Sequence, residues 1–306
     1  MTTISSRPLV VPDSKKRALN ALTSPPRVAW PSVAALGIVL VGVGASTGLG
    51  LSGAIPLWAA CLLSSVFLTW EFTAIHEALH RSLSNNVTLN DGLGHIGIAV
   101  LLPHSPLAVF RWYHARHHRF TNGENDPDRW THGPFWQLPL RWMTIDFAYL
   151  YSFIVRDHKD PIGRKLIKRA VVHVGGTLAV VAALTALGYG MEVLLLWFLP
   201  TRLAFLYMGF AFFWLPHSGA MERYTQQTDP TLASSMRLGG ESVLNPGLQF
   251  HNYHLIHHLY PSTPSYRHPA VWRLLEEEIR ACGIAVNHGY DFKATLYPPR
   301  TEPNHA

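Results

Sequence analysis

Two long stretches of the chain carry almost no charge, and each is broken near its middle by residues that favour a turn. Val28–Trp70 has no charged residue over 43 positions, about twice the ~20 residues that cross the hydrocarbon core of a bilayer. The stretch from 171 to 216 has only Glu192 and Arg202 as charges. The pattern predicts two hairpins of membrane-spanning helices. We expect the four spans over residues 31–50, 55–75, 171–189 and 193–216.

Shorter apolar stretches lack the length or composition of a span. Residues 92–110 are uncharged, but they contain His95, His104 and two prolines, which favours a re-entrant or interfacial segment. Residues 142–155 are too few to cross a bilayer and are expected to lie at its interface. Pro269–Cys282 has the spacing of a short amphipathic helix.

The basic residues indicate how the hairpins are oriented. The turns within both hairpins lack Lys and Arg, whereas the other segments carry nearly all of them. Since cytoplasmic segments are enriched in Lys and Arg, both termini are expected in the cytoplasm. We expect residues 1–27 to be a flexible cytoplasmic tail and 28–306 to form a single membrane domain. Its cytoplasmic cap would consist of 76–170 and 217–306.

The composition agrees with an all-α integral membrane protein. Asp, Glu, Lys and Arg make up 14% of the chain, against ~25% in soluble domains. This low charge excludes intrinsic disorder. Two cysteines are too few for a disulfide scaffold. The net charge is +6. The basic residues cluster beside the apolar runs, so we expect the bilayer as a partner and no nucleic acid.

Histidine is the unusual residue, with 18 copies, and three clusters of it follow predicted helices. Residues at i, i+3 and i+4 share a helix face, so each cluster presents two or three imidazoles together. Neutral imidazole is a common metal ligand. The clusters are HxxxH at His76 and His80, HxxHH at His114, His117 and His118, and HxxHH at His254, His257 and His258.

The predicted topology brings these clusters to one side of the membrane. Two spans separate the second cluster from the third, and a segment 92–110 that does not cross keeps the first with them. His217, at the end of the fourth span, is a ninth candidate ligand. Nine imidazoles exceed the need of one metal and fit two ions with four or five ligands each. Imidazole suits zinc, copper, iron and nickel, so the spacing alone leaves the metal open.

The order HxxxH, HxxHH, HxxHH between two apolar hairpins resembles the membrane fatty acid desaturase and carotenoid hydroxylase superfamily. The segments His114–Asp128 and Asn252–Pro261 look like its β-carotene hydroxylase branch, although Glu77 stands where that family often has Asp. The resemblance implies two iron ions and O2 as co-substrate, with the nine histidines as ligands and no other catalytic residue. It also implies a separate electron donor, such as a ferredoxin or a cytochrome.

Four further residues are candidates to support the ligands. Asp126 and Asp128 form a turn after the second cluster and are expected to orient a ligand imidazole through its second nitrogen. Asn252 and His251 precede the third cluster, and Asn252 is a candidate to contact a metal-bound water. A solvated turn is the alternative for the two carboxylates.

The substrate and two other functions stay open at this point. The resemblance favours hydroxylation of a carotenoid ring, with fatty acyl desaturation in the same superfamily as the alternative. His76-Glu77-Ala78-Leu79-His80 is also HExxH, the motif of a zinc protease, but an intramembrane protease leaves both HxxHH clusters unexplained. A metal carrier would place its site near mid-membrane, unlike these histidines.

Overall fold

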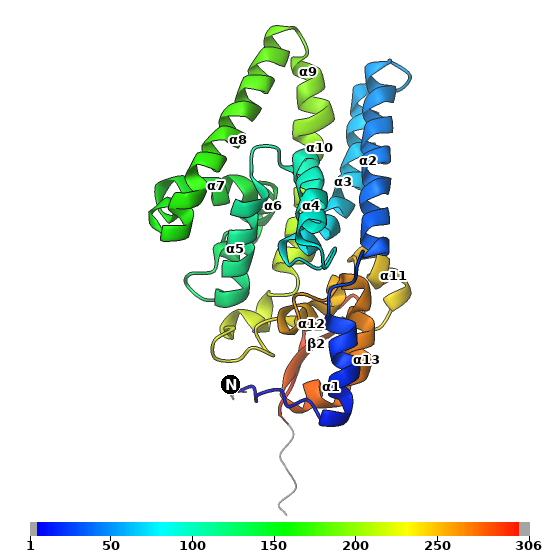
Figure 1. The fold of residues 1–306 in the computed structure, drawn as a ribbon, viewed down its shortest axis with the longest axis vertical. Helices are drawn as coiled ribbons and strands as arrows, with labels where there is room; N and C mark the ends of the chain where they lie inside the picture. The colour runs from blue at the N-terminus through cyan, green and yellow to red at the C-terminus, as the bar shows by residue number, and fades with distance from the viewer. Residues whose placement is uncertain (1–4, 300–306) are drawn as a thin grey trace, which may run out of the picture. The chain divides into compact units, whose positions relative to one another are not determined.

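The computed structural model describes residues 5–299 of the chain. Residues 1–4 and 300–306, the ends of the predicted tail and of the predicted domain, lie outside the described part. Figure 1 shows a chain made mainly of helices. The helices are α1 (Asp13–Thr23), α2 (Trp30–Leu51), α3 (Leu57–Leu79), α4 (Val87–Leu101), α5 (Leu107–Phe120), α6 (Leu138–Met143), α7 (Ile145–Val155), α8 (Pro161–Ala186), α9 (Gly190–Val193), α10 (Leu199–Met208), α11 (Glu241–Gly247), α12 (His254–Leu259) and α13 (His268–Ala281), and the strands are β1 (Ser235–Leu238), β2 (Ile284–His288) and β3 (Thr295–Tyr297).

The chain divides into two compact units, whereas the sequence predicted a single domain. The span unit consists of residues 26–114 and 130–210, and the terminal unit of residues up to 25, 115–129 and from 211 onwards. Helix α5 passes from one unit to the other between His114 and Ala115. The two units are described separately below.

Four helices are long and apolar enough to cross a membrane, as the sequence predicted. They are Trp30–Leu51, Leu57–Leu79, Pro161–Ala186 and the continuous helical run Gly190–Trp214. Within the span unit, α2 and α3 lie side by side (Figure 1). This arrangement confirms the all-α membrane fold. The last run contains two π-helical turns, Leu194–Phe198 and Gly209–Trp214, and such turns occur often near functional sites.

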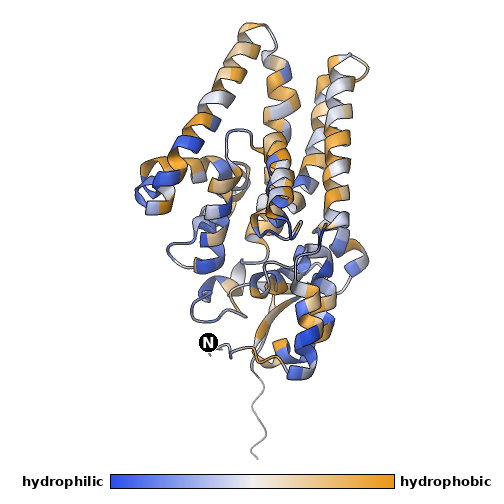
Figure 2. Ribbon diagram, in the orientation of Figure 1, coloured by the Kyte–Doolittle hydropathy of each residue, from blue (hydrophilic) through white to orange (hydrophobic). Residues whose placement is uncertain are grey.

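The third span begins ten residues earlier than predicted. Its helix α8 starts at Pro161, and the Asp160 side chain accepts hydrogen bonds from the backbone N–H groups of Ile162 and Gly163. A carboxylate at this position caps orphan amides of the first turn. The sequence analysis placed the start at residue 171 because the intervening residues are basic. Figure 2 shows these first turns in blue and most of the remaining α8 in orange.

The segment 92–110 is divided between two helices. Helix α4 is 15 residues long and ends at Leu101, which is shorter than a span, and α5 begins at Leu107 after a turn containing Pro103 and Pro106. The interfacial candidate 142–155 corresponds to the end of α6 and to α7. Helix α13 confirms the predicted amphipathic helix, since Val271, Trp272, Leu275 and Ile279 are buried along one face.

The amino-terminal segment is not the flexible tail that the sequence predicted. Residues 13–23 form α1, which lies beside α13 in the terminal unit (Figure 1). Leu19 is buried, and Lys15 Nζ lies 2.6 Å from the Glu278 carboxylate. The prediction was wrong because α1 is strongly polar and its partner helix is more than 240 residues away in the sequence.

A small sheet in the terminal unit was also not predicted. Strand β2 pairs in parallel with β1 and antiparallel with β3. The inward side chains of Met236, Ile284 and Val286 join the core formed by α13 and α12. The sheet therefore supports the short helix α12, which carries the third histidine cluster.

Candidate metal centre

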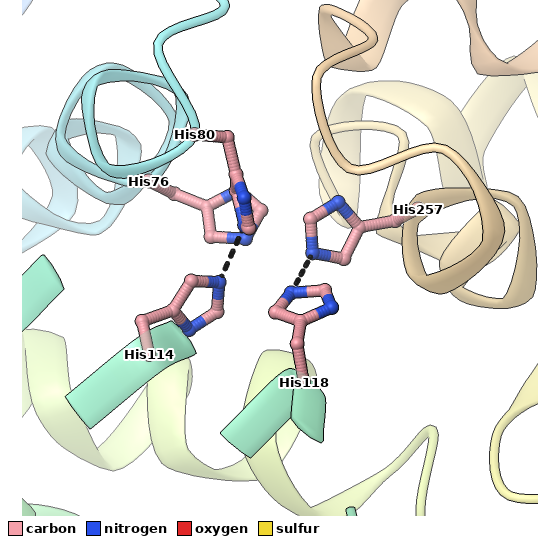
Figure 3. Close-up of side chains that lie close together, drawn as sticks. All are labelled: His76, His80, His114, His118 and His257. Atoms are coloured by element: carbon pink, nitrogen blue, oxygen red, sulfur yellow. Dashed lines mark hydrogen bonds between the residues drawn. The ribbon is translucent and has the colours of Figure 1, made fainter. Parts of the chain in front are cut away.

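The span unit brings three of the predicted ligands together. His76 and His80 lie one turn apart at the end of α3, and His114 lies on α5. The Nε2 atoms of His80 and His114 are 2.7 Å apart. The ring of His76 lies 5.0 Å from that of His80 and 4.7 Å from that of His114, between centroids. Figure 3 shows these three imidazoles converging from two helices, as the HxxxH spacing predicts.

A polar network holds the end of α3 in this position. Arg111, one turn before His114, donates hydrogen bonds to the carbonyls of Leu79 (3.1 Å) and Ala78 (2.9 Å). Asn90 Nδ2 also donates to the Ala78 carbonyl, at 3.0 Å. These carbonyls belong to the last turn of the helix, where the regular intrahelical donors run out and the Arg81 N–H is a further donor to Ala78. The network therefore fixes the last turn of α3, which carries both His76 and His80.

Asp91 completes the network by binding Arg111, with its Oδ1 2.6 Å from Nη2. Burial by itself would raise the pKa of Asp91, but hydrogen bonds from Arg111 and Asn90 outweigh burial and lower the pKa. The zinc-protease alternative needs a third ligand besides His76 and His80. Because the Asp91 carboxylate is bound to a guanidinium, it is not available for that role.

The terminal unit contains a second group of four buried histidines, His117, His217, His254 and His258. Their ligand atoms all lie within 4.8 Å of one another. The Nε2 of His254 is 2.9 Å from the Nε2 of His217 and 3.1 Å from that of His258. The group joins α5, the segment after Trp214 and α12. It includes His217, which the sequence analysis added as a ninth ligand.

The protonation of these rings favours a bound cation. His217 Nδ1 lies 3.0 Å from the Ala233 carbonyl and donates its proton there. A neutral imidazole has one N–H, so His217 Nε2 presents a lone pair toward His254. Burial lowers the pKa of both His254 and His258 well below the usual value, and neighbouring imidazoles lower it further. Neutral rings with converging lone pairs are the form that binds a metal.

His117 is oriented by the two carboxylates that the sequence analysis singled out. Its Nδ1 lies 3.0 Å from Asp126 Oδ1 and 3.2 Å from Asp128 Oδ2. Burial by itself would lower the pKa of His117, but Asp128 and Asp126 outweigh burial and raise the pKa to about 9. The carboxylates therefore stabilise positive charge in this buried place. They also leave Nε2 of His117 as the nitrogen available to a metal.

The remaining two predicted ligands form a pair in the terminal unit. His118 Nε2 and His257 Nε2 lie 2.9 Å apart, and the two ring centroids are separated by 4.6 Å. The second dashed line in Figure 3 marks this pair. Each of the nine predicted ligands thus has another predicted ligand beside it within its own unit.

The two other candidates have different surroundings. His251 is buried among ligand rings, 5.8 Å from His254 between centroids, and burial lowers its pKa to about 4. Asn252 uses its amide group to join two segments, since Nδ2 donates to Asn245 Oδ1 at 3.0 Å. Its contact with a metal-bound water stays a prediction.

Sequence reasoning missed two residues that lie beside the ligands. His268 is buried with its ring centroid 5.9 Å from that of His257. Burial lowers its pKa to about 3. Arg111 is the residue described above that holds the end of α3. His268 lies outside the three clusters and Arg111 binds backbone carbonyls, so no short motif marks either residue.

Comparison with known proteins identifies a family whose model covers most of the chain. The family model described as "Fatty acid desaturase" matches residues 52–290. The chain is 31% identical to the sn-1 oleoyl-lipid 12-desaturase of Arthrospira platensis over 134 residues, covering 41% of this chain and 37% of that protein. It is 24% identical to the dihydrorhizobitoxine desaturase of Bradyrhizobium elkanii over 247 residues, covering 67% of this chain and 68% of that protein.

The family match, together with four candidate membrane spans and clustered buried histidines, supports an integral membrane oxidoreductase with a candidate metal centre. The chain belongs to the fatty acid desaturase family. This result confirms the resemblance at the level of the superfamily. The chain spans about a third of the length of the first relative, so substrate and partners are treated as proposals.

Proposed function

We propose that the protein uses O2 and external electrons to oxidise a C–H bond of a long hydrocarbon chain, at a centre of two iron ions. The observation that carries the proposal is the buried set of four imidazoles around His254. Buried polar groups of this number are costly unless a partner satisfies them. A metal ion supplies that partner.

The residues fit two ions. His117, His217, His254 and His258 offer one set of four nitrogens in the terminal unit. His76, His80 and His114 offer a second set in the span unit, and His118 and His257 are the remaining proposed ligands. Iron bound by imidazoles would supply the activation of O2, with two electrons from a separate ferredoxin or cytochrome.

The protein itself supplies orientation and a dry environment. Asp126 and Asp128 hold His117 by its Nδ1–H, and the Ala233 carbonyl holds His217 in the same way. Such partners fix the ring orientation of a ligand and its tautomer. The ligands His76, His117, His217, His254, His257 and His258 are buried, so bulk water is kept from the reacting C–H bond.

Desaturation of a lipid acyl chain is the reaction that we propose first. The relatives are named as desaturases, and one name specifies an oleoyl lipid. Hydroxylation of a carotenoid ring is the second candidate. Its support is the resemblance of His114–Asp128 and Asn252–Pro261 to the β-carotene hydroxylase branch. Both substrates are long, apolar and reach the protein from the bilayer.

We also propose that both termini and the histidines lie on the cytoplasmic side. The turns at 52–56 and 187–189 contain no Lys or Arg, whereas the first turns of α8 contain four. This asymmetry is the positive-inside pattern. A soluble electron donor would then reach the histidines from the cytoplasm.

One lipid analysis separates the candidate reactions. The protein is expressed in a bacterium that makes β-carotene, and total lipid is compared by mass spectrometry with cells that express His117→Ala. Acyl chains lighter by two hydrogens indicate desaturation, and carotenoid heavier by one oxygen per ring indicates hydroxylation. An unchanged lipid pool in the presence of a co-expressed electron donor would contradict the proposal.

Metal content tests the centre independently of turnover. We expect two irons per purified chain, and we expect His217→Ala to lose the ion of its own set. His173→Ala is the matched control, because His173 lies outside all groups of potential ligands in the described chain. One zinc per chain in the wild-type protein would instead support the HExxH protease.

A further inference from the structure

A large apolar groove runs along α8 within the span unit. Its volume is about 1040 Å³, at the upper end of the ~300–1,000 Å³ common for ligand sites. We call it the α8 groove. One wall is formed by α8, and the other by α2, α4, the segment after α4, and the helical run that begins at α9. Figure 1 shows α8 diverging from that run beyond their short connection.

The groove lies among helices that have the length and hydropathy of membrane spans. Only 6% of the most apolar part of α8 is buried, against 56% for α3. Val172 and Val180, which line the groove, are both more than half exposed. In a bilayer, the medium beside such side chains is lipid hydrocarbon. The groove therefore opens to acyl chains and not to water.

The lining matches a hydrocarbon chain in polarity and in length. From Val172 to Leu184, the lining extends along 13 residues of α8, or roughly 18 Å, more than half of the ~30 Å hydrocarbon core. Glu192 is its sole Asp, Glu, Lys or Arg residue, and it lies on α9 beside the connection from α8. Along its remaining length, the lining has no Asp, Glu, Lys or Arg side chain that could pair with a charged headgroup or a charged metabolite.

The opposite end of the groove adjoins the segment that leads into the histidine helix. His173 Nδ1 lies 3.1 Å from the Pro103 carbonyl, and both residues line the groove. Pro103 precedes α5 by four residues, and α5 carries His114. The groove thus extends from the hairpin turns to the start of the helix that bears a proposed ligand.

We propose that the α8 groove binds one hydrocarbon chain of the substrate directly from the bilayer and directs it toward α5. This inference rests on the proposed function for the identity of the chain as substrate. An acyl chain and an isoprenoid chain share the required chemistry. The occupant that we favour is the acyl chain of a membrane lipid, because the relatives are named as desaturases and one name specifies an oleoyl lipid.

Two neighbouring glycines of α8 allow a matched test. Gly176 lines the groove, whereas Gly175 lines a different cavity, together with Leu150 and Ile154 of α7. A Cβ added at either glycine meets no atom within 4 Å, so both positions have room for the start of a side chain. Gly176→Phe places a ring in the groove, and Gly175→Phe places the same ring outside it.

The experiment is photo-crosslinking of the full-length protein in phosphatidylcholine vesicles. The probe is a phosphatidylcholine with a diazirine in the middle of one acyl chain, and mass spectrometry locates the labelled residues. We expect label at Val180 and Leu196 in wild type and in Gly175→Phe. In Gly176→Phe we expect a roughly tenfold loss, as for displacement of two buried methylenes.

Three outcomes would overturn the inference. These are equal labelling in both variants, equal loss in both, or label spread evenly around α8. A β-carotene competitor that removes the label would assign the groove to an isoprenoid chain and overturn the acyl assignment. Labelling needs no turnover, so a protein that binds the probe as expected but oxidises no lipid would contradict the proposed function and leave the groove in place.

Discussion

Arg111 Nη2 donates a hydrogen bond to the Ala78 carbonyl at 2.9 Å, and through it α5 holds the last turn of α3. Ala78 lies between His76 and His80, so the guanidinium positions both imidazoles through the backbone of the helix end. Arg111 is therefore a positioning residue, and its own side chain is held by Asp91.

We expect Arg111→Gln to weaken the metal site of the span unit. The variant loses charge-assisted hydrogen bonds, each worth about 1.5–3 kcal/mol when buried and less where water reaches it. Iron should fall from two per chain toward one, with the remaining ion retained by the set around His254. Elemental analysis of the purified protein measures this change.

Arg119→Gln is the control for that variant. Arg119 lies on the same helix, is exposed, and stacks on the Phe120 ring at 5.2 Å from its centroid. Iron content in this control should equal that of wild type. Full iron content in Arg111→Gln would contradict the positioning role.

Asp126→Asn and Asp128→Asn should each make metal easier to remove. Loss of a carboxylate partner of a ligand imidazole typically lowers metal affinity about 10–100-fold. The rate of iron loss to a chelator measures the effect. Glu124→Gln in the same turn is exposed and should behave like wild type. Unchanged retention in both Asp variants would show that the carboxylates do not support His117.

Removing one partner of the buried ion pair in the span unit should cost more stability than removing both. Arg202 binds Asp146 through two contacts of 2.7 Å each, and both side chains are almost fully buried. Arg202→Met removes the guanidinium and leaves the carboxylate with His104 Nε2, 3.1 Å away, so the variant should lose about 3–5 kcal/mol of stability. The double variant Arg202→Met/Asp146→Leu should recover most of this loss.

A surface ion pair provides the comparison for these variants. Arg280 and Glu276 pair at 2.9 Å on α13, but both side chains are substantially exposed. Arg280→Met should lower stability by less than about 1 kcal/mol. Thermal unfolding in detergent gives the stability of the wild type and of these three variants. If the double variant is no more stable than Arg202→Met, the stability loss of Arg202→Met does not come from the charge left on Asp146.

Gly97 should be intolerant of a methyl group, unlike its neighbour Gly92. A Cβ at Gly97 would overlap the carboxylate of Glu71 on α3, which is fully buried and has no hydrogen-bond partner among the described residues. Gly97→Ala should therefore be destabilising. Adding Glu71→Ser should relieve the overlap.

Gly92→Ala is the matched control on the same helix, because nothing lies within 4 Å of its added Cβ. Alanine is a better helix former by about 1 kcal/mol, so this variant should be slightly more stable than wild type. Thermal unfolding separates the two alanine variants. Equal stability in Gly97→Ala and Gly92→Ala would contradict the close approach of α3 and α4.

The parts of the molecule that follow local periodicity could be predicted from the sequence. The four spans follow from uncharged runs, and α13 follows from the apolar spacing of Val271, Leu275 and Ile279. The clustered ligands follow from helical spacing, because i, i+3 and i+4 positions share a face. His217 was found from its place at the end of a span.

The parts that depend on distant contacts could not be predicted. Helix α1 is polar, and it is ordered through contacts such as Lys15 with Glu278. The start of α8 was misplaced because its first turns are basic and their capping residue, Asp160, lies outside the apolar run. Arg111 and His268 act through tertiary neighbours, so their roles became visible only in the folded chain.

The length of α8 has a consequence for the bilayer around it. Its 26 residues extend roughly 39 Å, about 9 Å more than a typical hydrocarbon core. The excess lies at the end that carries Arg164, Lys165, Lys168 and Arg169, side chains that reach outward to lipid phosphates. The apolar remainder, residues 170–186, extends roughly 26 Å, so the basic turns lie at the headgroups and the excess helix length imposes no tilt inside the hydrocarbon core.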